Sequence, residues 1–294
     1  MAVSQYEFTG KRPLRLKEMS TDGKADGVHK ADKPAILAKT RENLAKIAQW
    51  QEKLYADGRE GVVFVLQAMD AAGKDSTIKH AMASLNPQGV DVVSFKQPSQ
   101  EELAHDYLWR AARALPPRGK IAIFNRSHYE DVLVVQVHDL QEGYRMAPRV
   151  LEDSRKEFFR KRYRQIRDYE EYLYENSYRI VKILLNVSKE KQRERFLERI
   201  ETPEKNWKFS PDDIRERRLF DEYLDTFDEV VNATASRHSP WYVLPADQKW
   251  YTRYLVSEIL TAELESCCHE YPKLPPAARA GLATCRRMLQ EEEA

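Results

Sequence analysis

Residues Val62–Ala81 read VVFVLQAMDAAGKDSTIKHA, and this stretch decides the fold of the chain. Its unbroken apolar run, Val62–Leu66, is typical of a strand that is buried on both faces of a parallel sheet. Ser76–Met82 is predicted to begin a helix. In a loop between such a strand and helix, backbone N–H groups and the positive end of the helix converge, which suits a phosphate anion.

The loop matches the phosphate-binding pattern GxxxxGK[ST] with two departures. Gly73 and Lys74 are in place, but Ala68 stands where the first glycine is expected and Asp75 takes the hydroxyl position. The strand, loop and helix context supports the prediction more strongly than the bare pattern does. We expect phosphate contacts from the loop and the residues that follow it, namely Ala71, Ala72, Gly73, Asp75, Ser76, Thr77 and Lys79.

The composition excludes several classes of partner. With 294 residues the chain can bury a sizeable core, and its length suits one large α/β domain. Because 48 basic residues oppose 47 acidic ones, no global field attracts nucleic acid or a membrane surface, and any anion site must be local. No apolar run approaches the roughly 20 residues of a transmembrane helix, and the N-terminus lacks a signal-peptide core. We therefore expect a cytoplasmic protein.

Cysteine and histidine provide no sign of a metal site. The three cysteines, Cys267, Cys268 and Cys285, lie near the C-terminus without metal-ligand spacing. Their odd number argues against a disulfide framework, so we expect free structural thiols. Seven histidines are scattered, and none pairs with Cys or an acid at metal spacing, so His128 and the others are expected to be structural.

Strands and helices alternate along the chain. Besides Val62–Leu66, four short apolar segments are predicted to be strands: Asp91–Phe95, Ile121–Asn125, Arg179–Asn186 and Trp241–Leu244. Between and around them, helices are predicted over 31–57, 100–114, 153–176, 189–200, 212–235 and 251–264. This order implies an α/β fold in which a central parallel five-stranded sheet carries helices on both faces.

The expected organisation is one domain with two flanking segments. Residues 1–30 are polar and contain glycines, and we interpret them as an extended or mobile arm. Residues 31–270 form the domain, in which the charged helices and loop over 189–218 resemble a lid. Residues 271–294 form a C-terminal tail that either packs or frays.

Two cations are candidates for phosphate binding at the ends of strands, where open α/β sheets place ligands. Lys96 follows the second strand, and Arg126 follows the third. The planar, permanently charged fork of Arg126 suits phosphate, although a salt bridge within the core is the alternative. Lys74 is the expected phosphate-bridging cation of the loop, and its alternative is a surface lysine.

Phosphoryl transfer needs the phosphates positioned, a metal ion held and cations placed where negative charge accumulates. Asp70 is a candidate for holding Mg²⁺ or orienting the attacking phosphate, or else it stabilises the turn through its own backbone. The third strand ends in Asn125, which can coordinate weakly but supplies no charge. We therefore predict Asp131 as a metal or catalytic carboxylate, with Glu130 as the alternative metal ligand and helix capping as the structural explanation of Asp131.

The predicted lid contains basic and acidic residues in nearly equal numbers, so it is not a simple cationic patch. The basic residues that face inward cannot be identified from the pattern. Trp207 either closes over a ligand or is a buried anchor of the lid.

Four blocks of sequence resemble the polyphosphate kinase 2 family. They are MDAAGKDSTI (Met69–Ile78), FNRSHYEDVLV (Phe124–Val134), KNWKFSPDDI (Lys205–Ile214) and SPWYVLPADQKW (Ser239–Trp250), in this order. The resemblance spans roughly residues 35–265. It implies a thymidylate-kinase-like P-loop fold with a mobile lid, dependence on Mg²⁺ with Mn²⁺ as a possible substitute, and reversible phosphate transfer between inorganic polyphosphate and a nucleotide. It also implies a homo-oligomer, either a dimer or a tetramer.

The resemblance assigns roles position by position. Asp70, Lys74 and Arg126 fall on the Walker A aspartate, the Walker A lysine and the Walker B arginine of the family, and the basic residues of the lid would include Arg193, Lys205 and Lys208. Many members have Asp where this chain has Asn125. NRSHYED together with AAGKD is similar to the subgroup that accepts nucleoside monophosphates and diphosphates, so the implied acceptors are ADP and AMP, with guanine nucleotides as a further class.

Two other functions remain open at this point. The first is an ATP-dependent nucleoside or nucleotide kinase, which would share the fold and the loop. The second is a non-catalytic protein that binds nucleotide or polyphosphate without turnover, a reading suggested by Ala68 and Asn125. A donor swap between polyphosphate and ATP distinguishes the first from the favoured function, and binding without transfer would indicate the second.

Overall fold

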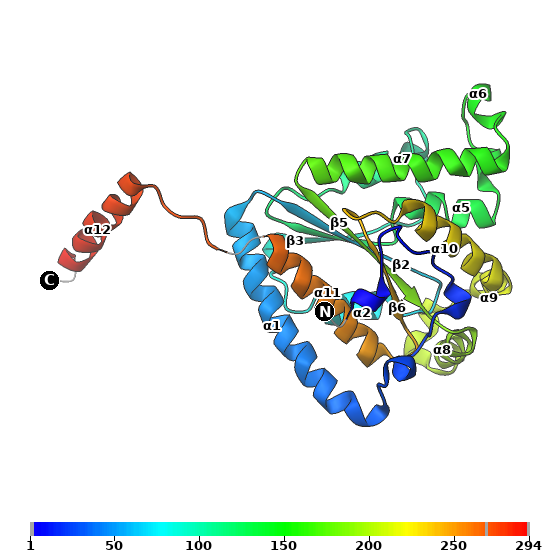
Figure 1. Cartoon of the computed structure of the whole chain (residues 1–294), viewed down its shortest axis with the longest axis horizontal. Coiled ribbons are helices and arrows are strands. Elements are labelled where there is room, and N and C mark those ends of the chain that lie inside the picture. Colours follow the sequence, from blue (N-terminus) through cyan, green and yellow to red (C-terminus); the bar gives the residue numbers. More distant parts are fainter. Residues whose placement is uncertain (1–2, 268–269, 293–294) are drawn as a thin grey trace.

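The central sheet has six strands. A computed structural model describes residues 3–267 and 270–292, and its strand order is β1-β6-β5-β2-β4-β3 (Figure 1). The five longer strands run parallel, and they are β2 (Gly61–Ala68), β3 (Val90–Ser94), β4 (Ile121–Asn125), β5 (Tyr178–Asn186) and β6 (Trp241–Pro245). All five were predicted. The predicted count of five strands is nevertheless wrong, because β1 (Glu7–Phe8) pairs antiparallel with β6 and is too short to show a pattern.

Helices cover both faces of the sheet, as predicted for an α/β fold. Along β2, Val62, Phe64 and Leu66 join the apolar cluster on one face, whereas Val63 and Val65 join the cluster on the other. Successive side chains of a strand point to opposite faces, so a strand covered on both sides is apolar throughout. Figure 1 shows the first face covered by α1 (Lys33–Asp57), α2 (Lys74–Ala81) and α11 (Lys249–Cys267). The second is covered by α7 (Arg155–Glu175) and α10 (Phe220–Thr234).

Two predicted helices are each divided in the structure. The segment 100–114 contains α3 (Gln100–Leu103) and α4 (Trp109–Arg113), and the segment 212–235 contains α9 (Pro211–Arg218) and α10. Leu219 lies between α9 and α10 at φ −90° and ψ 16°, which breaks the helical run without a glycine or proline to announce it. The remaining helices of the domain are α5 (Val134–Val137), α6 (Pro148–Leu151) and α8 (Lys189–Glu201). Ser188 caps α8 by accepting a hydrogen bond from the Lys191 N–H.

The N-terminal segment is not a free arm. Val3, Tyr6, Phe8, Leu14 and Leu16 are buried in the apolar clusters of the domain. Between them run single 3₁₀ turns and the short strand β1. The expectation of an extended or mobile arm fails because the buried residues are irregularly spaced among polar ones, so no helical or strand period reveals them.

The C-terminal segment forms α12 (Pro276–Glu291), a helix whose residues are all exposed and which projects from the domain in Figure 1. Cys267 and Cys285 are free, as predicted, and Cys268 lies outside the described residues. In the part of the chain that the structure describes, no helix is both long and apolar enough to cross a membrane.

Candidate active site

The phosphate loop connects β2 to α2 at the carboxyl edge of the sheet. Gly73 is the N-cap of α2 and has φ 108°, a conformation that side-chain-bearing residues rarely adopt. Ala71 has φ 59°, in the left-handed region that is costly for alanine. The structure therefore builds the predicted loop, and it does so with a strained backbone that its surroundings must hold.

Lys74 lies at the centre of the loop and is not a surface lysine. Its side chain is buried, and its Nζ donates to the carbonyl of Ala68 at 2.6 Å and to that of Met69 at 3.5 Å. Burial, and then the nearby charge of Arg126, lower the pKa of Lys74 to about 8, against the opposing effect of the Asp70 carboxylate. Anionic phosphates bound beside this amine would favour its protonated form.

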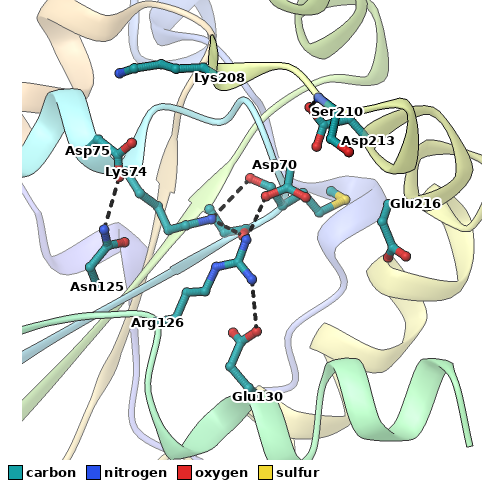
Figure 2. A network of polar contacts seen from close by, with 12 residues as sticks. Asp70, Lys74, Asp75, Asn125, Arg126, Glu130, Lys208, Ser210, Asp213 and Glu216 are labelled. Atoms are coloured by element: carbon teal, nitrogen blue, oxygen red, sulfur yellow. Dashed lines mark hydrogen bonds and ion pairs between the residues drawn. The ribbon is translucent and has the colours of Figure 1, made fainter. Parts of the chain in front are cut away.

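Arg126 lies at the tip of β4 and faces the loop. Its backbone has φ 63°, and its guanidinium pairs with Asp70 Oδ1 at 2.9 Å and with Glu130 Oε2 at 3.4 Å (Figure 2). Its side chain is 39% exposed, so the pair lies at an open site and not within the core. Figure 2 shows Asp70, Lys74, Arg126 and Glu130 pointing toward one another, and the structure thus brings four predicted residues together.

Asn125 and Asp75, each of which departs from the usual residue of its motif, contact each other. Asn125 Nδ2 donates a hydrogen bond of 3.0 Å to Asp75 Oδ1 (Figure 2). An aspartate at position 125 would place a second negative charge against Asp75 instead. The amide at the end of β4 therefore matches the carboxylate in the phosphate loop.

Asp131 is not part of this cluster. It is 5% exposed, pairs with Arg110 Nη2 at 3.5 Å and accepts a hydrogen bond from Tyr144 Oη at 3.1 Å. Burial raises its pKa, against the lowering effect of Arg110. Asp131 is not a helix cap either, because it ends the 3₁₀ turn His128–Asp131, and the N-cap position of the following helix α5 is Leu133, without a side-chain cap.

Glu130 is the carboxylate of this segment that faces the site. Burial raises its pKa, while Arg126 and Lys74 act to lower it. Together with Asp70 it lines a pocket of about 140 Å³ between the phosphate loop and the lid. The pocket is also lined by two carboxylates of α9 and by an apolar wall. Its other lining residues include Leu133, Val134, Gln192, Asp213, Glu216, Phe220, Tyr223 and Phe227.

The predicted basic residues of the lid have different surroundings. Arg193 is exposed, Lys205 pairs with Glu198, and the Nζ of Lys208 lies 4.8 Å from the centre of the Trp207 ring. Figure 2 places Lys208 on the lid, across the phosphate loop from Asp75. Trp207 is 79% exposed, so it is not a buried anchor of the lid.

The other predicted phosphate contacts are spread around the loop. Asp75 and Lys79 are exposed on α2, Thr77 is buried, and Ser76 Oγ donates to the Gly73 carbonyl at 3.1 Å. Lys96 is exposed beyond β3, and its carbonyl accepts a hydrogen bond from Arg110.

Several residues of the site were missed by sequence analysis. Gln192 and Arg195 of α8 are buried and bind the carbonyls of the phosphate loop. Together with Phe196 and Arg199 they are spaced three or four residues apart, so they lie on one face of the helix. This spacing could have revealed them, but charged residues occupy the other faces of α8 as well and mask the pattern. From α9, Glu216 pairs with His138 at 3.0 Å and accepts from Tyr223 Oη at 2.8 Å.

The site suits Mg²⁺ that is bound jointly by carboxylates and substrate phosphates, and not a metal ion that protein side chains hold alone. Among the described residues, no three His, Cys, Asp or Glu side chains gather as a ready-made metal site. Mg²⁺ usually keeps several waters and binds one or two carboxylates together with substrate phosphates. Asp70 and Glu130 are oxygen donors of this type beside the phosphate loop.

Comparison with known proteins gives a consistent result. Residues 30–271 match the sequence model of a family described as polyphosphate kinase 2. The chain is 47% identical over 249 residues to the ADP-polyphosphate phosphotransferase of Rhodopseudomonas palustris, covering 85% of this chain and 86% of that one. It is 44% identical over 228 residues to the AMP/ADP-polyphosphate phosphotransferase of Meiothermus ruber, covering 78% and 80%. The crystal structure of polyphosphate kinase 2 from Arthrobacter aurescens superposes with a TM-score of 0.82 at 34% identity, covering 96% of each chain.

Proposed function

Because the chain belongs to the polyphosphate kinase 2 family, we propose that it transfers the terminal phosphate of inorganic polyphosphate to ADP and AMP, reversibly and with Mg²⁺. One observation carries the proposal beyond the family. Lys74 of the loop and Arg126, the residue after β4, place two cations at one site, and Asp70 and Glu130 lie beside them. Phosphoryl transfer depends mainly on such positioning and on electrostatic stabilisation.

The four residues have distinct roles in this proposal. Lys74 and Arg126 bind the terminal phosphates of the donor and stabilise the charge that develops on the transferred group. Asp70 orients the attacking oxygen of the nucleotide, and with Glu130 it would hold the metal. When bound, Mg²⁺ supplies positive charge to the phosphate oxygens. The attacking oxygen forms a bond to the terminal phosphorus as the bond to the bridging oxygen breaks, and the shortened polyphosphate leaves.

The pocket beside Arg126 supports a nucleotide as acceptor. Its apolar wall, which includes Leu133, Phe220 and Phe227, offers contacts to a base or ribose next to the reacting phosphates. The lid would close over this pocket and exclude water that would otherwise hydrolyse the donor.

A donor swap tests the function. Purified protein with Mg²⁺ and long-chain polyphosphate is given ADP and AMP separately, and nucleotide products are separated by ion-exchange chromatography. We expect ATP from ADP and ADP from AMP. Formation of neither product, together with phosphorylation of a nucleoside from ATP, would make the chain an ordinary nucleoside kinase. Activity with ADP alone would remove AMP from the proposal.

Four finer features of the prediction are proposed on the same basis. They are the use of Mn²⁺ in place of Mg²⁺, acceptance of guanine nucleotides, assembly into a dimer or tetramer, and a cytoplasmic location. Metal and base substitution in the same assay test the first two, sedimentation of the purified protein tests the third, and cell fractionation tests the fourth.

A further inference from the structure

We propose that Gln192 and Arg195 of α8 are positioning residues that orient the phosphate loop by binding its backbone carbonyls. The inference rests on the proposed phosphotransferase function and adds to it. Neither residue belongs to the phosphate-loop motif, and of the two only Gln192 lines the pocket. Their evidence is a set of hydrogen bonds to the loop backbone.

Side chains bind five consecutive carbonyls of the loop. Lys74 Nζ holds those of Ala68 and Met69. Gln192 Nε2 donates to the carbonyl of Asp70 at 3.0 Å. Arg195 Nη1 donates to the carbonyls of Ala71 at 2.9 Å and Ala72 at 2.8 Å. Two of the three donors come from one face of α8, because residues three apart on a helix are neighbours.

The direction of these carbonyls determines the direction of the N–H groups. In a planar trans peptide, the carbonyl of one residue and the N–H of the next point in opposite directions. When α8 holds the carbonyls of Asp70 and Ala72, the N–H groups of Ala71 and Gly73 turn away from α8. A phosphate loop works by presenting its N–H groups in one direction. The contacts from α8 thus set the geometry on which phosphate binding depends.

The same contacts stabilise an unfavourable backbone. Ala71 has φ 59°, in the left-handed region that is unfavourable for a residue with a β-carbon, so the conformation persists only where the surroundings impose it. Arg195 binds the carbonyl of this residue directly. A β-carbon added at Gly73 would lie 3.8 Å from Arg195 Nη1, so the guanidinium lies against the loop.

Arg195 also connects the loop to a third segment. Its Nη2 donates to the carbonyls of Ala246 at 2.7 Å and Asp247 at 3.0 Å, just after β6. The side chain is 7% exposed, and these four carbonyls serve the buried guanidinium as hydrogen-bond acceptors. A lysine could not reproduce this geometry, because its single ammonium lacks the planar fork.

Gln192 extends the connection to the second helix of the lid. Arg217 of α9 donates to Gln192 Oε1 at 2.7 Å and to the Lys189 carbonyl at 2.7 Å. The Gln192 amide therefore accepts from α9 and donates to the loop. Movement of α9 would change the hydrogen bond that orients Gln192, and with it the hydrogen bond from Gln192 to the Asp70 carbonyl of the loop.

The experiment combines kinetics with a readout that needs no turnover. Arg195→Ala, Arg195→Lys and Gln192→Ala are compared with Arg164→Ala, which removes an exposed arginine of α7. Hydrogen–deuterium exchange of peptides that span residues 69–76 reports on the loop amides. Steady-state kinetics with polyphosphate and ADP give kcat and KM for the donor, and guanidinium at non-denaturing concentration is added to Arg195→Ala as a chemical rescue.

We expect Arg195→Ala to lose at least about tenfold in kcat/KM for the donor and to exchange its loop amides faster, with partial rescue by guanidinium. Arg195→Lys should lose activity as well, and guanidinium should restore little of it. Gln192→Ala should show a smaller loss of kcat/KM and a smaller increase in loop exchange. Arg164→Ala should match the parent. A merely structural role would reduce the folded fraction without changing KM, loop exchange or the response to guanidinium, and that result would overturn the proposal.

The design separates this inference from the function on which it rests. If Arg195→Ala does not fold, Gln192→Ala provides the test. Unchanged exchange of the loop amides in that variant would refute the positioning role. If the parent shows no transfer from polyphosphate, the proposed function fails. Faster loop exchange in the variants together with weaker binding of pyrophosphate by calorimetry would still support the positioning role.

Discussion

The phosphate loop and the tip of the lid are both rich in functional residues, but their physical states are opposite. In the loop, the carbonyls from Ala68 to Ala72 are hydrogen-bonded to side chains, Lys74 is buried, and Ala71 is held at a positive φ. In the lid tip, made of the 3₁₀ helix Pro203–Lys208 and α9, no residue is buried. Some of its charges form exposed pairs, such as Arg215 with Asp212, whereas Asp213 and Glu216 are partly buried beside the pocket.

This contrast matches the two tasks of a transferase. Groups that stabilise developing charge work best when they are fixed before the reaction, because they then need no reorganisation. Elements that close over a substrate come from the least stable part of a fold. Exposed ion pairs contribute little to stability. We therefore expect the lid tip to move more readily than the phosphate loop. Changes in the loop should therefore reduce turnover strongly, and changes in the lid tip should act weakly and mainly on KM.

Lys74→Ala should have the largest effect. Removal of the buried amine deletes a charge partner of the transferred phosphate, and kcat/KM should fall by at least about 100-fold. Circular dichroism should show a folded protein, because the charge of Lys74 is itself disfavoured by burial. Initial rates with polyphosphate and ADP are the measurement. Activity within a few-fold of the parent would place the phosphate elsewhere and remove the loop from the comparison.

Glu130→Gln and Asp131→Asn form a matched pair at adjacent positions. Glu130 faces Arg126 in the pocket, so Glu130→Gln should raise the Mg²⁺ concentration for half-maximal activity by roughly tenfold. Asp131 is buried against Arg110, so Asp131→Asn should lower the free energy of unfolding by about 2 kcal/mol and leave the Mg²⁺ titration unchanged.

Metal titrations and urea unfolding of both variants check this pair. The reverse pattern, with Asp131→Asn shifting the metal titration, would return Asp131 to the metal site. The parent and Lys74→Ala serve as references for the folded baseline.

Sequence patterns predicted the parts of the site that are formed by residues close together in the sequence. The strand, loop and helix around Lys74 follow from one apolar run and one glycine, and the polar tip of β4 follows directly from its strand. Patterns could not choose between Glu130 and Asp131, because a 3₁₀ turn over His128–Asp131 points neighbouring residues in different directions. The prediction of Asp131 as the second carboxylate depended on that choice.

Long-range contacts account for the other differences. Arg195 and the loop are more than a hundred residues apart, and only the folded chain brings the guanidinium to the Ala71 carbonyl. The same is true of β1, whose partner lies in β6. The N-terminal segment shows a related effect, since its buried residues gain their burial from helices far along the chain.

The pairing of Asn125 with Asp75 predicts a compensating change within the rigid region. Asn125→Asp alone should lower kcat about fivefold, because two carboxylates then face each other beside the phosphates. Adding Asp75→Ser should recover most of the loss, with a coupling free energy of about 1 kcal/mol. A double-mutant cycle on kcat measures it. Additive effects of the two changes would mean that the hydrogen bond between the side chains has no role in turnover.

Trp207→Ala should have the smallest effect and tests the lid tip. The side chain is 79% exposed, so its loss should change the free energy of unfolding by no more than about 0.5 kcal/mol. Its ring lies beside Lys208, whose Nζ is 4.8 Å from the ring centre. If the ring covers a bound ligand, KM should rise about threefold while kcat holds, because stacking on an exposed ring is weak before closure. Thermal unfolding and substrate titration give both quantities. A fall in stability without a change in KM would instead indicate that Trp207 anchors the lid in a closed form, and the lid tip would then share the rigidity of the loop.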